Sequence, residues 1–327
     1  MSIFQKRVAF KPFEYPEVVK FKEAIQHSYW LVSEWNFLSD INDYHTKLDS
    51  KEKSIIRNTI LAISQIEVAV KKFWGQLGEK FPKAEIDQVG MTFAANEVIH
   101  SDAYSHLLEI LGFNDDFTHL NEKPAIQKRV EYLQKYLKNV SVEDVEERKK
   151  FSTTLALFSL FIENVSLFSQ FAIIKSFNRH KGILKDIDNV IDSTRSEETI
   201  HAQFGAWLVN QIRKEYPHWF TEEFTNELTK AAHKALKAEI GVLDWIFESG
   251  ELDFLSKETL VEFLKDRFNE SFKMIGEEPI YEVNRDLLKS LQWFEEETNT
   301  NVNVDFFHKK PSTYTKRQQS VNAEDLF

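Results

Sequence analysis

Five long segments of this 327-residue chain carry apolar residues at helical spacing with almost no helix breaker inside them. Such segments bury their apolar faces by packing against one another, which favours a helical bundle over any sheet architecture. Composition agrees, because Gly 9 and Pro 7 together fall well below the roughly 12% of average usage. The predicted helices cover Ser54 to Leu77, Gln88 to Leu111, Glu147 to Phe177, Asp186 to Lys214 and Thr221 to Glu248, with shorter ones at Tyr15 to Trp30 and Ser256 to Met274.

The helical segments are not separated by any linker rich in Ser or Gly, so we expect one helical domain over residues 1–297. A polar tail, residues 298–327, follows it and is expected to be flexible. Acidic residues outnumber basic ones, and the net charge of −11 argues against a nucleic-acid partner. Because the chain has Cys 0, a bound metal would have to use His and carboxylate ligands.

Two features bear on location. The N-terminal residues lack the apolar stretch of a secretory signal, so we expect a cytoplasmic protein. The most apolar segment, Phe151 to Phe177, is long enough to cross a bilayer but carries Glu163, Asn164 and Gln170 in its interior. We interpret it as a buried helix and expect no membrane contact.

Two Glu-x-x-His motifs lie in the middle of predicted helices. They are Glu97-Val-Ile-His100 and Glu198-Thr-Ile-His201, while a third pair at 215–218 contains a proline and falls at a helix end. Residues three apart lie on one helix face, so each motif can offer two ligands to one metal ion. One such motif is weak support for a metal site, but two on separate helices carry more weight.

A single carboxylate inside an apolar run precedes each motif. Glu67 lies 30 positions before Glu97, and Glu163 lies 35 positions before Glu198. A buried carboxylate without a partner costs several kcal/mol, so something must compensate both. The combination is the ligand set of carboxylate-bridged dimetal sites in four-helix bundles. Four carboxylates balance two divalent ions, and oxygen ligands with one imidazole per metal suit Fe or Mn.

The segment Asn96 to His106 resembles the Glu-x-x-His-x-x-x-Tyr signature of a known family, the radical-generating small subunit of class I ribonucleotide reductase. The similarity extends from about Phe21 to the C-terminus. It implies an all-α, ferritin-like helical bundle that is a homodimer and holds two metal ions per chain, Mn or Fe, activated by an oxygen species. The implied metal ligands are Glu67, Glu97, His100, Glu163, Glu198 and His201.

The resemblance also implies roles outside the ligand set. Tyr104 would occupy the position of the radical tyrosine, although variants in the family keep the oxidising equivalent on the metals. Trp30 and Glu197 would start a route for long-range electron transfer, and Tyr314 in the tail would relay it to the partner. In most of the family the first ligand is Asp, whereas this chain has Glu67.

By the same resemblance the chain would supply an oxidising equivalent to a separate large subunit, which would reduce ribonucleotides to deoxyribonucleotides. The tail, ending in Asp325, Leu326 and Phe327, would dock to that subunit. A flavodoxin-like activating protein is a further candidate partner. Three alternatives stay open from the residues: a stand-alone ferritin-like dimetal oxidase, a metal-storage protein, and a helical scaffold whose six candidate ligands are incidental. Lys71 is either a cation near the site or a surface lysine.

Overall fold

Helices dominate the computed structural model, which describes residues 2–68, 70–137 and 141–298. Within these ranges no strand forms, and only an isolated bridge joins Leu252 and Leu255. The all-α prediction is therefore confirmed. Tyr314 and the docking residues 325–327 lie outside the described residues, so the predictions for the tail remain predictions.

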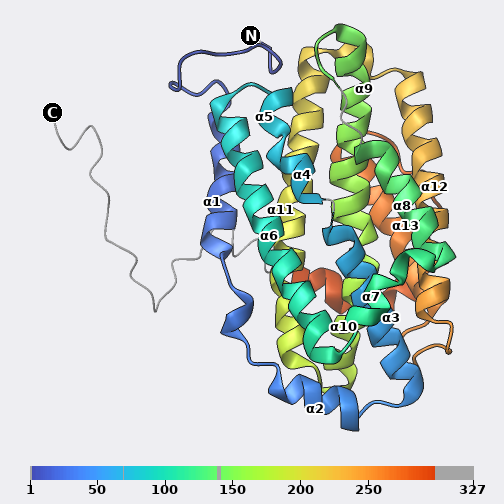
Figure 1. Ribbon diagram of the computed structural model, residues 1–327. Coiled ribbons are helices and arrows are strands. Elements are labelled where there is room, and N and C mark those ends of the chain that lie inside the picture. Colours follow the sequence, from blue (N-terminus) through green and yellow to red (C-terminus); the bar gives the residue numbers. More distant parts are fainter. Residues whose placement is uncertain (1, 69, 138–140, 299–327) are drawn as a thin grey trace, which may run out of the picture.

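Four long helices form the centre of the bundle (Figure 1). They are α3 (Ser50–Glu67), α6 (Ala84–Leu111), the continuous run α9 (Val145–Ala156), η4 (Leu157–Ser166) and α10 (Phe168–Lys181), and α11 (Lys185–Glu215). Helix α3 packs against α6 and α10, and α11 packs against η4 and α10. These are the four helices predicted to carry the candidate ligands.

Further helices cover the two sides of this centre (Figure 1). On one side α1 (Val19–Ser28) packs against α6 and α11. On the other side α8 (Pro124–Leu137), α12 (Glu222–Ile246) and α13 (Lys257–Met274) pack against η4. The remaining helices are α2 (Leu38–Thr46), α4 (Val70–Gly75), α5 (Leu77–Lys80), α7 (Asn114–Thr118) and α14 (Arg285–Leu288), with short 3-10 turns η1 (Pro16–Val18), η2 (Val32–Glu34), η3 (Leu120–Glu122), η5 (Pro217–Trp219) and η6 (Lys289–Leu291).

Local signals explain where several helices begin and end. The Asp49 carboxylate accepts a hydrogen bond from the Glu52 backbone N–H at 2.8 Å, and the Glu52 carboxylate accepts one from the Asp49 backbone N–H at 3.2 Å. These two bonds form a capping box before α3. Asp144 begins α9 in the same way. Helix α6 ends at Gly112, whose φ of 79° lies in the left-handed region that glycine adopts without strain. The predicted end of this helix is confirmed.

Two predicted helices differ from the structure. The segment Ser54 to Leu77 was expected to be one helix, but α3 ends at Glu67 and α4 begins at Val70. The Lys71 ammonium group donates to the Glu67 carbonyl oxygen at 3.0 Å, so a side chain satisfies a helix-end acceptor there. The segment Glu147 to Phe177 is continuous as expected, but its middle part, η4, is a π-helix. Helices α2 and α8 were not predicted from the sequence.

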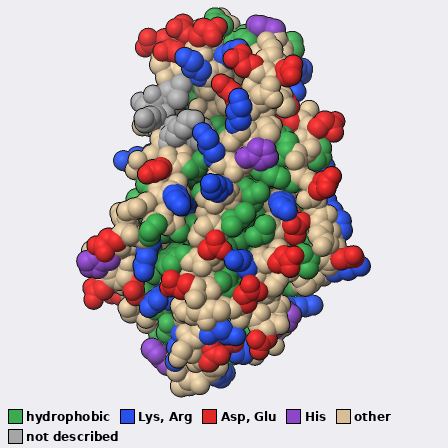
Figure 2. Space-filling model, turned by 90° about the vertical axis from the view of Figure 1, so that its right-hand side faces the viewer, with side chains coloured by type: hydrophobic (Ala, Val, Ile, Leu, Met, Phe, Trp, Pro, Cys, Tyr) green, Lys and Arg blue, Asp and Glu red, His purple; other side chains and the backbone are tan. Residues whose placement is uncertain are grey.

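The helix over residues 145–181 is long and apolar enough to cross a membrane, yet the apolar window is entirely buried inside the molecule. This burial is typical of the core helix of a bundle and agrees with the interpretation of Phe151 to Phe177. On the outer face shown in Figure 2, acidic and basic side chains are interspersed. That face therefore does not present the continuous basic surface that phosphate backbones require.

Candidate metal centre

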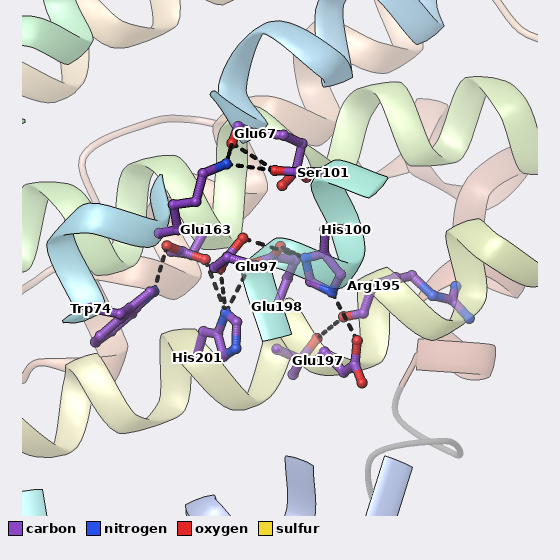
Figure 3. A network of polar contacts seen from close by, with 12 residues as sticks. Glu67, Trp74, Glu97, His100, Ser101, Glu163, Arg195, Glu197, Glu198 and His201 are labelled. Carbon is purple, nitrogen blue, oxygen red and sulfur yellow. Dashed lines mark hydrogen bonds and ion pairs between the residues drawn. The ribbon is translucent and has the colours of Figure 1, made fainter. Parts of the chain in front are cut away.

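The six predicted ligands come together in the middle of the bundle (Figure 3). Their oxygen and nitrogen atoms form two overlapping groups, in each of which all the atoms lie within 4.8 Å of one another. One group is Glu67, Glu97, His100 and Glu198, and the other is Glu97, Glu163, Glu198 and His201. Glu97 and Glu198 belong to both groups. Two carboxylates shared between two histidine sites form a candidate centre for a pair of metal ions.

Both imidazoles turn their Nδ1 atoms toward the shared carboxylates. His100 Nδ1 lies 3.4 Å from Glu97 and 3.1 Å from Glu198. His201 Nδ1 lies 3.0 Å from Glu97 and 3.3 Å from Glu198, and it is also 3.3 Å from Glu163. The helical spacing of each Glu-x-x-His motif produces this arrangement, since residues three apart project from one face.

Burial and mutual interactions shift the protonation of the cluster. Burial raises the pKa of Glu67, and the negative charges of Glu97 and Glu198 add to the increase against the opposing effect of His100. Burial also raises the pKa of Glu163, with the charge of Glu198 adding to it.

The pKa of Glu198 is instead held well below its usual range, because its close polar contacts with Glu163 and the two histidines outweigh the effect of burial. Burial would lower the pKa of His100 and His201, but hydrogen bonds to the surrounding carboxylates outweigh it and raise both. The surrounding carboxylates therefore favour a positive charge at the centre of the cluster.

The donor atoms fit metal ions on their own chemistry. Both carboxylate oxygens of Glu67, Glu97 and Glu198 and the Nδ1 atom of His100 are buried without a hydrogen bond of good geometry. Buried polar atoms of this kind are rare and costly, at about 1–3 kcal/mol each. Four carboxylates neutralise two divalent ions, and an oxygen-rich set with one imidazole on each side suits Mn or Fe.

A hydrogen-bonded chain leads from one histidine toward the outside of the bundle. His100 Nε2 lies 2.8 Å from Glu197 Oε2, and the Trp30 indole N–H donates to the same oxygen at 3.0 Å. Ser28 donates to the other carboxylate oxygen at 2.9 Å. A carboxylate that holds the distal nitrogen of a ligating imidazole fixes its tautomer and orientation. The family resemblance implied that Trp30 and Glu197 lie beside this histidine, and the structure brings the three side chains together. Their roles stay predictions.

Tyr104 lies one helical turn beyond His100 on α6 and is only 1% exposed. Its hydroxyl has no hydrogen bond of good geometry. Burial raises its pKa, with the charge of Glu67 adding to the increase, so the phenol is held in its neutral form. The assignment of a radical to this residue stays a prediction.

Three residues at the site were missed or left undecided by sequence reasoning. The Trp74 indole N–H donates to Glu163 Oε1 at 3.0 Å. Lys71 donates to Ser101 Oγ at 2.7 Å as well as to the Glu67 carbonyl oxygen, so it is a half-buried cation near the site. Trp74 could have been predicted to lie near the carboxylates, because a buried indole N–H usually needs an acceptor and Trp74 lies on the segment that follows Glu67.

Comparison with known proteins places this arrangement in context. A family model described as "Ribonucleotide reductase, small chain" matches residues 7–287. The chain is 26% identical over 97% of its length, and 86% of the relative's, to a probable ribonucleoside-diphosphate reductase small subunit of Invertebrate iridescent virus 3. It is 21% identical, over 97% of its own length and 90% of the relative's, to the ribonucleoside-diphosphate reductase subunit beta of Treponema pallidum.

Solved structures share the fold. A dimanganese(II)-NrdF of Streptococcus sanguinis superposes with a TM-score of 0.75, at 15% identity, over 91% of this chain and all of that one. An R2-like ligand-binding oxidase with a Mn/Fe cofactor superposes with a TM-score of 0.68, at 19% identity, over 80% of this chain and 94% of the other. These likenesses confirm the ferritin-like helical bundle.

Proposed function

Since the chain belongs to the ribonucleotide reductase small-chain family, we propose that it assembles a Mn or Fe pair, stores an oxidising equivalent and supplies it to a separate large subunit. The family prediction made from the Glu-x-x-His motifs is confirmed, and so is the assignment to oxidoreductases. The reaction served by the pair of subunits is the reduction of ribonucleotides to deoxyribonucleotides.

The observation that carries the proposal is the sharing of two carboxylates between two histidine groups. Glu97 and Glu198 would be available to both ions, while Glu67 with His100 would hold one ion and Glu163 with His201 the other. Bound there, the metal pair supplies reversible one-electron redox chemistry. The bundle encloses the ligands, all of which are buried, and so keeps bulk water away from them.

Glu197 has a defined task in this proposal. One of its oxygens meets both the Trp30 indole N–H and His100 Nε2. When an electron moves from Trp30 toward the site, the indole proton can pass to this oxygen over a hydrogen bond of 3.0 Å. Trp30 is therefore the inner end of the route to the partner, and Tyr314 in the tail is its proposed outer relay.

The partners follow from the same family assignment. A dimer of this chain would bind the large subunit through the C-terminal residues Asp325, Leu326 and Phe327. Removing the last 15 or so residues should abolish binding to the large subunit and leave metal loading unchanged. Unaltered affinity of the truncated chain would refute the docking role of the tail. A flavodoxin-like protein is the proposed source of the activating oxygen species.

The test of the function is low-temperature electron paramagnetic resonance on protein loaded separately with Fe(II) and Mn(II) and then oxidised. Metal content and turnover with the large subunit are measured on the same samples. A sharp tyrosyl signal that disappears in Tyr104→Phe would place the oxidant on the tyrosine. A multiline metal signal in an active sample without a tyrosyl component would place it on the metals. Failure to bind a metal pair would overturn the proposal.

A further inference from the structure

The ligand Glu163 lies in an unusual helix. Residues Leu157–Ser166 form a π-helix of ten residues inside the run from α9 to α10. This type of helix is rare and occurs mostly as a single widened turn. A π-helix longer than a single widened turn therefore needs support from neighbouring elements. The direction in which Glu163 points depends on that support.

Helix α13 provides much of it through one arginine. Arg267 Nε donates to the Asn164 carbonyl oxygen at 2.8 Å, and a second guanidinium nitrogen donates to the Asn164 side-chain oxygen. The guanidinium lies 3.7 Å from the centre of the Phe168 ring, and Arg267 is almost completely buried. Two parallel hydrogen bonds from a charged donor fix a partner in position and orientation.

A second residue of α13 extends this contact. The Asn164 amide donates to Ser271 Oγ at 3.0 Å, and Ser271 donates to the Leu160 carbonyl oxygen at 3.4 Å. Donors from α13 thus bind carbonyl oxygens of the π-helix at two positions four residues apart. A shift of this segment back to α-helical register would move Asn164 relative to Arg267 and break the paired hydrogen bonds.

Asn164 is the residue next to Glu163, so whatever fixes Asn164 also fixes the ligand. We propose that Arg267 is a positioning residue for the metal centre. Arg267 holds the π-helix in the register that points Glu163 toward His201. This inference rests on the proposed function, because it treats Glu163 as a metal ligand. Glu163 belongs to only one of the two groups of ligands, so the role of Arg267 is confined to that side.

The test compares Arg267→Met with Asn269→Ala. Methionine keeps an unbranched apolar side chain but removes the guanidinium. Asn269 lies on the same helix, but its side chain binds the backbone of residues 280 and 281 instead of the π-helix. Asn269→Ala therefore controls for a general loss of packing by α13.

Two measurements are made on each protein: equilibrium Mn(II) binding, and hydrogen exchange of a peptide covering residues 157–166. We expect Arg267→Met to weaken one Mn(II) site by about 10–100-fold, the usual cost of losing an outer partner of a ligand. The other site keeps its affinity, and exchange in 157–166 rises. Asn269→Ala changes neither quantity at a comparable loss of stability.

Equal behaviour of the two variants, or equal weakening of both Mn(II) sites by Arg267→Met, would overturn the positioning role. If Arg267→Met does not fold, Asn164→Ala replaces it, because it keeps the bond to the backbone carbonyl and removes the one to the side chain. Asn164→Ala should also weaken one Mn(II) site and leave the other unchanged, with a smaller loss of affinity than Arg267→Met. If wild-type protein binds no metal pair, the proposed function fails. Hydrogen exchange of residues 157–166 still decides whether Arg267 holds the π-helix in place.

Discussion

A close approach between two helices that carry candidate ligands gives the sharpest prediction. Gly205 lies one turn after His201 on α11, and Ser159 lies about one turn before Glu163 on the π-helix. A methyl group built on Gly205 would lie less than 3.0 Å from the Ser159 side chain, a distance that real Cβ atoms essentially never show. The absence of a side chain at Gly205 therefore lets the two ligand helices approach each other.

Gly205→Ala separates two opposing effects. Helix propensity alone predicts that alanine stabilises α11 by about 1 kcal/mol. The steric argument predicts the opposite, because the helices would have to move apart by roughly 1.5–2 Å to reach the usual carbon contact of about 3.5–4.0 Å. Overpacking of this kind costs about 1–3 kcal/mol. We expect a net loss of stability, together with weaker Mn(II) binding, since Glu163 and His201 would separate.

Urea unfolding of the metal-free variants measures the steric part directly. Ser159→Gly removes the Cβ atom that Gly205→Ala would meet, so the double variant should recover at least ~1 kcal/mol relative to the sum of the single changes. Ser159→Ala is the matched control: it loses the hydroxyl bond to the Leu155 carbonyl oxygen but keeps the Cβ atom, and it should not rescue. A coupling below ~0.5 kcal/mol between Gly205→Ala and Ser159→Gly, or a stabilised Gly205→Ala protein, would refute the reasoning.

Three further predictions concern the cluster and its surroundings. Glu67→Ala should leave one Mn(II) site intact, whereas Glu97→Ala should remove both, because Glu97 belongs to both ligand groups. Metal analysis after loading and desalting distinguishes the two variants. Equal metal losses would contradict the sharing of Glu97 by both sites. Arg129→Met should lower the free energy of unfolding in urea by about 3–5 kcal/mol. The substitution leaves the buried Glu239 carboxylate, which Arg129 contacts at 3.1 Å, without its partner. Trp30→Phe should load metal normally and lose turnover with the large subunit, and retained turnover would exclude Trp30 from the route.

The gathering of the six candidate ligands could be predicted from the sequence because their spacing is local. A Glu-x-x-His pair has its geometry fixed by the helix that carries it, and a lone carboxylate in an apolar run such as Glu67 stands out at once. The chain from His100 to Trp30 could be predicted only through the family resemblance, since its members lie far apart in the sequence. Nothing local indicated that α3 would end at Glu67.

The π-helix could not be predicted either, and the reason is physical. Apolar residues in the segment Leu157–Ser166 are compatible with both an α-helix and a π-helix, so the choice is made by contacts with other elements. Those contacts come from Arg267 and Ser271, more than a hundred residues later, and from the close approach of α11 at Gly205. A single sequence gives no sign that these positions meet.

The two sides of the cluster are connected differently to the rest of the molecule, although their motifs are alike in sequence. His100 Nε2 is held by Glu197, and a carboxylate in this position makes a ligating imidazole a stronger base. His201 Nε2 is buried without a hydrogen bond, and its ring centre lies 4.1 Å from that of Phe93.

An ion on the His100 side would thus have the more electron-donating ligand and the hydrogen-bonded link to Trp30. An ion on the His201 side would sit against an apolar wall, with Glu163 fixed by Trp74 and by the helix that Arg267 supports. Under the proposed function, the side next to Trp30 would therefore be the one that exchanges electrons with the partner. The opposite side depends instead on the packing of α11 and the π-helix, so variants at Gly205 and Arg267 should act on metal binding and leave the connection from His100 to Trp30 in place.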